Sequence, residues 1–195
     1  MKFPNIPNQK TGHAQDVVSM KCLDQAAAAD FYETVVQRLK AVNDWDELED
    51  SVKTKFTLMD ESGMEQKNSP QLGDHIMIDI PGPGSVAGAG YDWVKIIDVL
   101  QGDEIDFPFY GFTLQPVAHP DTQDETVAHF YQEQASLTIL VRRLGNCILA
   151  ETHGRNEVDN TKEVPLMDKV RNEIVALGGK LGMGKVQWKP LTEGL

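Results

Sequence analysis

The sequence predicts an α+β domain with an antiparallel, strongly curved sheet of about six to seven strands. The sheet packs on a long C-terminal helix and follows an N-terminal amphipathic helix. Apolar residues recur every three or four positions from residue 24, alternate between residues 52 and 157, and return to helical spacing after residue 165. The connections between alternating segments are short, which favours an antiparallel meander, because parallel strands need long crossovers.

The first helix is expected from Asp24 to about Leu48, with Asp24 as its N-cap. Its apolar stripe consists of Ala28, Phe31, Val35, Leu39 and Val42. Residues 1–19 are polar and are interpreted as an N-terminal arm without an assigned structure. We expect one domain over residues 20–184 and a tail over residues 185–195, which carries Trp188.

Seven alternating segments follow the first helix, at residues 52–58, 76–80, 93–99, 109–118, 127–131, 137–143 and 146–153. The last two are expected to form a hairpin closed at Leu144-Gly145-Asn146. In the segment 127–131, His129 and Tyr131 are expected on one face of a strand and Phe130 on the other. The final helical stripe consists of Leu166, Met167, Val170, Ile174, Leu177 and Leu181.

Composition excludes several classes of function. The chain of 195 residues has a net charge of −12, which argues against binding nucleic acid or an anionic membrane surface. It has no apolar run long enough to span a bilayer, and no secretory signal is recognised, so a cytoplasmic protein without membrane insertion is expected. Cys22 and Cys147 form no CxxC pair, and reduced structural thiols are expected.

The glycine-rich segment 81–90 does not match a nucleotide-binding loop, because an alternating strand pattern follows it instead of a helix. A flexible connection or a gate over a cavity explains Gly82, Gly84, Gly88 and Gly90 better. His119, His129 and His153 lack the spacing of metal ligands, so neither a metal site nor a cofactor is expected.

The densest polar cluster is Glu151 to Glu157. Within it His153 suits acid or base chemistry, and Arg155 suits binding of a carboxylate. The alternative is a strand exit in which Arg155 and Glu157 form a structural ion pair. The polar groups on strand faces either line a ligand cavity or face water.

Three stretches resemble the helix-grip superfamily, which includes START-type lipid-transfer domains, the birch-pollen-allergen type and polyketide cyclases. They are 42–45 (VNDW), 73–76 (GDHI), and 111–114 (GFTL) leading to His119-Pro120 and Glu125; the last is similar to an uncharacterised bacterial branch. The resemblance implies an elongated cavity between the sheet and the last helix, with segment 81–90 as a gate. The candidate ligand-binding residues are Trp93, His119, His129, Tyr131, Arg142, His153 and Arg155.

Three functional hypotheses follow. The first is a carrier of a small, mainly apolar molecule, with Arg142 or Arg155 available for a carboxylate. The second is a hydrolase, cyclase or isomerase that uses His153 or His129. The third is a homodimeric interaction module that uses the tail around Trp188.

Overall fold

The computed structural model describes residues 4–48, 54–80, 85–104, 107–122, 125–160 and 191–195. The predicted C-terminal helix at residues 166–181, the tail residue Trp188 and the glycines Gly82 and Gly84 lie outside these ranges. The prediction of a long C-terminal helix is therefore not tested by the structure.

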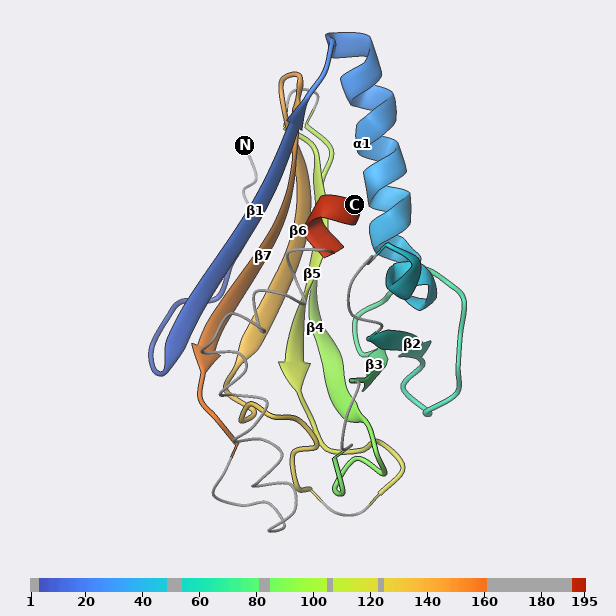
Figure 1. The fold of residues 1–195 in the computed structure, drawn as a ribbon, viewed down its shortest axis with the longest axis vertical. Coiled ribbons are helices and arrows are strands. Elements are labelled where there is room, and N and C mark those ends of the chain that lie inside the picture. The colour runs from blue at the N-terminus through green and yellow to red at the C-terminus, as the bar shows by residue number, and fades with distance from the viewer. Residues whose placement is uncertain (1–3, 49–53, 81–84, 105–106, 123–124, 161–190) are drawn as a thin grey trace.

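The described residues form a seven-stranded antiparallel sheet with a few helices (Figure 1). The strand order is β1-β7-β6-β5-β4-β3-β2, so the first strand joins the last and the rest form a meander. The strands are β1 (His13–Cys22), β2 (Lys55–Met59), β3 (His75–Asp79), β4 (Asp92–Gly102), β5 (Phe109–Pro116), β6 (Ser136–Leu144) and β7 (Cys147–Glu157). This agrees with the predicted α+β class, and six of the seven strands match predicted segments.

β1 begins in the segment 1–19, which was predicted to be an arm without an assigned structure. It pairs along its length with β7, and the expected boundary after residue 19 falls inside it. The strand was missed because it is an edge strand that is mostly exposed on both faces, so its apolar residues do not alternate clearly. Its outward-facing Val18 and Met20 are 53% and 66% exposed.

The predicted strand at 127–131 is wrong. In place of a ladder, Ala128 accepts a hydrogen bond from the backbone of Trp93 and donates one to Val117, and Tyr131 makes a single bridge to Asp159. The segment is therefore irregular chain that crosses the end of the sheet. The predicted hairpin between β6 and β7 is confirmed, with Gly145 at φ +60° in its turn.

The first helix is confirmed as α1 (Gln25–Lys40), followed by the 3₁₀ helix η1 (Val42–Glu47). The side chain of Asp24 accepts a hydrogen bond from the backbone of Ala27 at 2.9 Å, as an N-cap does. η1 turns the chain so that Trp45 enters the core, where its Nε1 donates to the carbonyl of Leu39 at 3.2 Å.

The core lies between α1, η1 and the face of the sheet that they cover (Figure 1). Trp45 packs edge-on against Phe56 and stacks parallel to Phe112, with ring centres 5.2 and 6.0 Å apart. Leu191 and Leu195 are buried in the same cluster. These described residues of the expected tail therefore belong to the domain core. Among the described residues, no helix has the length and hydropathy required to cross a bilayer.

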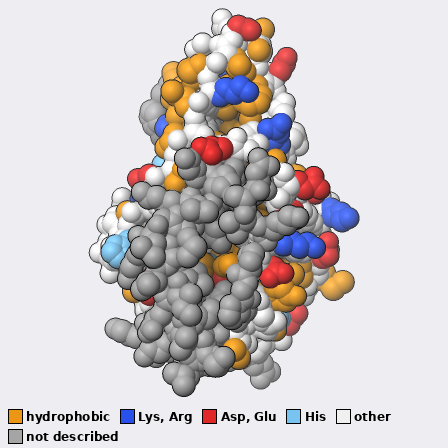
Figure 2. All heavy atoms as spheres, in the orientation of Figure 1, with side chains coloured by type: hydrophobic (Ala, Val, Ile, Leu, Met, Phe, Trp, Pro, Cys, Tyr) orange, Lys and Arg blue, Asp and Glu red, His pale blue; other side chains and the backbone are white. Residues whose placement is uncertain are grey.

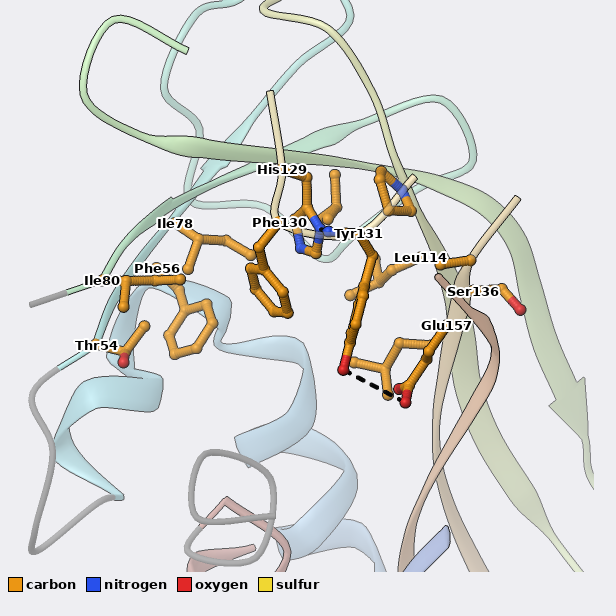
Figure 3. A pocket seen from close by; sticks show the side chains of 14 residues that line it. Thr54, Phe56, Ile78, Ile80, Leu114, His129, Phe130, Tyr131, Ser136 and Glu157 are labelled. Atoms are coloured by element: carbon orange, nitrogen blue, oxygen red, sulfur yellow. Dashed lines mark hydrogen bonds between the residues drawn. The ribbon is translucent and has the colours of Figure 1, made fainter. Parts of the chain in front are cut away.

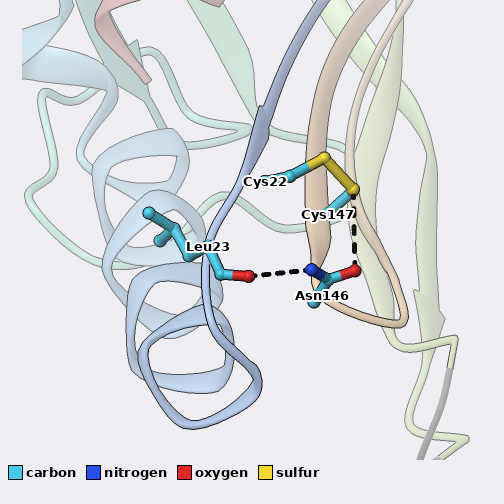
Figure 4. Close-up of a disulfide and its surroundings, with 4 residues drawn as sticks. All are labelled: Cys22, Leu23, Asn146 and Cys147. Atoms are coloured by element: carbon cyan, nitrogen blue, oxygen red, sulfur yellow. Dashed lines mark hydrogen bonds between the residues drawn. A yellow bond between two sulfur atoms is a disulfide. The ribbon is translucent and has the colours of Figure 1, made fainter.

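Cys22 and Cys147 form a disulfide, which corrects the expectation of reduced thiols (Figure 4). The two residues are directly opposite in the β1–β7 ladder, with Cα atoms 4.0 Å apart. Just beyond them the Asn146 side chain donates to the carbonyl of Leu23 at 2.8 Å. The pairing was not predictable because the cysteines are 125 residues apart and β1 itself was not recognised.

Candidate functional site

An apolar pocket opens on the core side of the sheet, beyond the cluster around Trp45 (Figure 3). Its cavity volume is about 50 Å³, within about 570 Å³ of space between protein atoms that includes open solvent. Its apolar wall comes from the sheet, through Phe56, Ile78, Val94 and Leu114. The irregular segment 128–135 supplies the facing wall, including Phe130.

The polar residues of the described pocket wall are few. They are Thr54, His129, Tyr131, Ser136 and Glu157. Thr54, His129, Ser136 and Glu157 are buried and Tyr131 is half-buried. An apolar wall with a small number of polar groups is typical of sites for small molecules.

Tyr131 and Glu157 form the polar pair of the pocket (Figure 3). The phenol donates a hydrogen bond to Oε2 of Glu157 across 3.5 Å. Burial raises the pKa of Glu157 to about 7, although the hydrogen bond from Tyr131 opposes this shift. Burial also raises the pKa of Tyr131, so the phenol stays protonated at neutral pH. Glu157 therefore changes its charge near pH 7 inside a mainly apolar wall.

A β-bulge brings Glu157 into the pocket. The β1–β7 register skips between the pairs Gln15–Gly154 and His13–Glu157, which leaves one extra residue on β7. Asn156 adopts φ +55°, a conformation that asparagine tolerates better than most residues. Without this extra residue, strand alternation would direct Glu157 to the opposite face, beside His153 and Arg155.

The N-terminal arm holds the bulge in place. The side-chain oxygen of Asn156 accepts hydrogen bonds from the backbone of Lys10 at 2.7 Å and Thr11 at 3.1 Å. Its backbone donates to the side chain of Gln9 at 2.9 Å, and its amide nitrogen donates to the carbonyl of Asn8. Residues that the sequence analysis left without a role thus position the acid of the pocket.

Of the sequence-predicted candidates, His129 and Tyr131 line the pocket. The imidazole of His129 stacks on Phe130, with ring centres 4.2 Å apart, and its Nδ1 accepts a hydrogen bond from the backbone of Tyr131 at 3.0 Å. This contact assigns the acceptor role to Nδ1, so in the neutral ring Nε2 carries the proton. The prediction that His129 and Phe130 lie on opposite faces was wrong, because the segment is not a strand.

His153, Arg142 and Arg155 lie on the opposite face of the sheet from Ala150 and Ile148, which pack in the core. Nε2 of His153 is 2.9 Å from Glu151 and its Nδ1 is 2.7 Å from Asp16. Glu151 also pairs with Arg142, and Asp16 pairs with Arg155 at 2.7 Å. We name these five residues the outer ion network.

The outer ion network explains three shifted pKa values. The hydrogen bond to Glu151 raises the pKa of His153, with Asp16 contributing in the same direction. Burial alone would raise the pKa of Glu151, but hydrogen bonds from His153 and Arg142 outweigh burial and lower it. The pKa of Asp16 is lowered in the same way, by Arg155 and His153 against its burial. The expected Arg155–Glu157 ion pair is replaced by the Arg155–Asp16 pair.

Trp93 and His119 pack against each other away from the described pocket wall, with ring centres 4.7 Å apart. Nε1 of Trp93 donates to the carbonyl of Gly88 at 3.2 Å. Gly88 and Gly90 belong to a tight turn in which the backbone of Gly90 donates to the carbonyl of Ser85 at 2.7 Å. The three histidines thus have different partners, and the described residues contain no cluster of His, Cys, Asp or Glu suited to a metal ion.

A second, more polar groove lies between β1 and α1, in the upper part of the face in Figure 2, where apolar side chains surround basic ones. Its wall includes Lys21 and Phe31, with the ammonium group 4.4 Å from the ring centre. Arg38, also in this wall, donates to the carbonyls of Gly194 and Leu195 at 3.0 Å. These contacts attach the last residues to α1.

Comparison with known proteins gives a fold relationship only. No family model matches the chain, and no curated protein matches it in sequence. A hypothetical protein from Helicobacter pylori has a similar structure, with a TM-score of 0.51 and 10% identity over 99% of this chain and 96% of that one.

Two weaker likenesses are to Ara h 8.0201 and to ginseng major latex-like protein 151 from Panax ginseng, both with a TM-score of 0.34. They are 11% and 9% identical, covering 93% and 89% of this chain and 97% and 98% of the others. The similarity to the Helicobacter protein concerns the fold alone.

Proposed function

We propose that this chain binds or carries a small, mainly apolar molecule in the pocket between the sheet and segment 128–135. The observation that carries the proposal is an apolar wall with a few polar side chains at Tyr131, Glu157 and His129. Arg142 and Arg155, first considered for a carboxylate, are engaged in the outer ion network instead.

Binding of the neutral fluorescent probe N-phenyl-1-naphthylamine tests the proposal. Ala135 is buried and lines the pocket, so Ala135→Leu should fill part of it and weaken probe binding by about tenfold or more, which corresponds to about 1.4 kcal/mol. Ala26→Leu, on the exposed first turn of α1, is the matched control and should bind like the parent protein. Absence of probe binding by the parent, or equal binding by both folded variants, contradicts the proposal.

An enzymatic role has one observation in its favour, the carboxyl group of Glu157 with its pKa near 7. A general acid or base works best when its pKa is near the working pH. In this alternative Glu157 exchanges a proton with a bound substrate, and His129 lines the same pocket. Hydrolysis of 4-nitrophenyl hexanoate by the parent and by Glu157→Gln tests it; equal rates would exclude this role of Glu157 in ester hydrolysis.

Segment 81–90 is retained as a proposed gate. Gly88 lies against Ala128, because a Cβ at position 88 would be 3.0 Å from the Ala128 Cβ. Ala128 precedes His129 in the pocket wall, so movement of this turn would be transmitted to the wall. Gly88→Ala also places a Cβ 1.9 Å from the carbonyl oxygen of Tyr91, and slower probe entry and exit in this variant would support the gate.

The Cys22–Cys147 disulfide bears on the expected cytoplasmic location. Structural disulfides persist in oxidising compartments and are rare in the reducing cytosol. We therefore propose a location outside the reducing cytosol. Alkylation of intact cells before extraction, followed by mass spectrometry, tests this: unmodified cysteines support it, and two alkylated cysteines contradict it.

A further inference from the structure

The described pocket wall has an acidic residue and no lysine or arginine. The acidic residue is Glu157, the single carboxylic acid among the described residues of the wall. The two candidate arginines, Arg142 and Arg155, pair with Glu151 and Asp16 on the other face of the sheet. A ligand carboxylate in the pocket would therefore meet Glu157, with no cation among the described residues of the wall to offset the repulsion.

The pocket also has a buried polar group that no described residue satisfies. The hydroxyl of Thr54, at the end of the pocket away from Glu157 (Figure 3), has no hydrogen-bond partner among the described residues. Thr54 is fully buried. A buried polar group without a partner costs free energy, which a ligand offsets if it supplies the missing hydrogen bond.

The carboxyl group of Glu157 has spare capacity to accept hydrogen bonds. Tyr131 occupies one site on Oε2 through a long contact of 3.5 Å. Oε1 lies over Gly154, where a Cβ would be 2.2 Å from it, so the absence of a side chain at position 154 makes room for the carboxyl group. A carboxylate has about four acceptor sites and donates nothing when ionised.

We propose that Glu157 makes this pocket selective for apolar molecules whose polar end donates hydrogen bonds and carries no negative charge. Hydroxyl and amine ends share this chemistry. The proposal rests on the proposed function, because it assumes that the apolar wall holds the body of a ligand. The polar end would donate a hydrogen bond to the carboxyl group of Glu157.

Competition against bound N-phenyl-1-naphthylamine tests the selectivity with three probes of equal chain length: octan-1-ol, octylamine and octanoate. At pH 8 we expect octanoate to compete at least about tenfold more weakly than octan-1-ol, because like charges in an apolar site repel strongly. Glu157→Gln should reduce the ratio between the competition strengths of octan-1-ol and octanoate to about threefold or less. Tyr131→Phe keeps the carboxyl group but removes the hydrogen bond that lowers the pKa of Glu157, so it should keep the ratio when measured at pH 9, where Glu157 is ionised.

A measurement on the parent protein makes the test independent of how well Glu157→Gln folds. Between pH 8 and pH 6 octanoate stays ionised while Glu157 gains a proton, so the ratio should fall towards that of the variant. The titratable or charged groups beside Glu157 are Tyr131, Asp159, Arg155, His13 across the ladder and His129 in the pocket wall. His13→Gln and His129→Gln identify any share of the histidines in the pH effect.

The outcomes separate the two proposals. The selectivity is overturned if octanoate competes as well as octan-1-ol at pH 8. It is also overturned if the ratio of their competition strengths is unchanged in folded Glu157→Gln and at pH 6. In either case the proposed function still stands if Ala135→Leu weakens probe binding. Absence of probe binding by the parent overturns both the proposed function and the selectivity. A ratio that falls in the variant and at pH 6, but not in Tyr131→Phe, supports the selectivity.

Discussion

Nδ1 of His153 lies 2.7 Å from Oδ1 of Asp16, and this contact joins β7 to the neighbouring edge strand β1. Nε2 of the same imidazole lies 2.9 Å from Oε2 of Glu151, a residue that is 2% exposed. A carboxylate this deeply buried needs charged partners, and Arg142 and His153 supply them. The outer ion network therefore has a structural explanation, independent of any ligand.

Replacing His153 by glutamine should lower the free energy of unfolding by about 1–3 kcal/mol at pH 6, because it leaves Glu151 with one charged partner fewer. The pKa of His153 is raised above 6.5 in the folded protein. The contribution of His153 to the free energy of unfolding is thus fully present below pH 6.5 and is lost as pH rises through its pKa in the folded protein. Urea unfolding at pH 6 and pH 9 measures the difference.

His13→Gln is the matched control for that prediction, since His13 is exposed on β1. It should leave stability nearly unchanged at both values of pH. A loss for His153→Gln that is equal at pH 6 and pH 9 would show that the charge of the imidazole contributes nothing.

Removing the disulfide with Cys22→Ser and Cys147→Ser together should lower the free energy of unfolding by about 2–5 kcal/mol. The bridge closes a span of 125 residues, so it restricts the unfolded chain substantially. Guanidinium unfolding with and without dithiothreitol provides the measurement. The reductant should destabilise the parent to the level of the double variant and leave the variant itself unchanged; insensitivity of the folded parent to complete reduction would contradict this.

Substitution of Asn156 separates backbone conformation from hydrogen bonding at the bulge. Asn156→Gly keeps the freedom to adopt a positive φ but removes the side-chain hydrogen bonds to the N-terminal arm. Asn156→Ala removes both and should be less stable than the glycine variant by about 1 kcal/mol. Thermal unfolding of the two variants measures this difference, and an alanine variant as stable as the glycine one would refute the assigned strain.

Glu157→Gln should make the protein more stable above pH 7, by an amount on the order of 1–3 kcal/mol. Burial raises the pKa of Glu157 from 4.5 to about 7, so the folded state binds the proton more tightly than the unfolded state. Its contribution to stability is fully present below pH 4.5 and is lost as pH rises through about 7. Unfolding curves of parent and variant at pH 5 and pH 8.5 measure it; parallel pH dependences would contradict the shifted pKa.

The sequence was sufficient for the elements whose signals are local. The stripe of α1 with its cap at Asp24, and the β6–β7 hairpin around Gly145, depend on residues a few positions apart. Segment 127–131 shows the limit of such signals. Its alternation imitates a strand, yet its backbone hydrogen bonds go to Trp93 and Val117 as a crossing loop.

Half of the site could not be predicted because its geometry depends on non-local contacts. Tyr131 and His129 were predicted as ligand-binding candidates, whereas Glu157 was considered for a structural ion pair with Arg155. Its true position depends on one extra residue in β7, held by backbone groups of Lys10 and Thr11 nearly 150 residues earlier. A left-handed asparagine before a glutamate is a weak signal in a single sequence.

The pairing of β1 with β7 also has a consequence for the order of events in folding. β1 precedes its partner by more than a hundred residues, so its ladder forms only after β7 has been synthesised. Contacts of this sequence separation slow the search for the native topology. Until then the long edge of β1 lacks its partner strand, and this stage of biogenesis is the one most exposed to aggregation and to pairing of cysteines between chains.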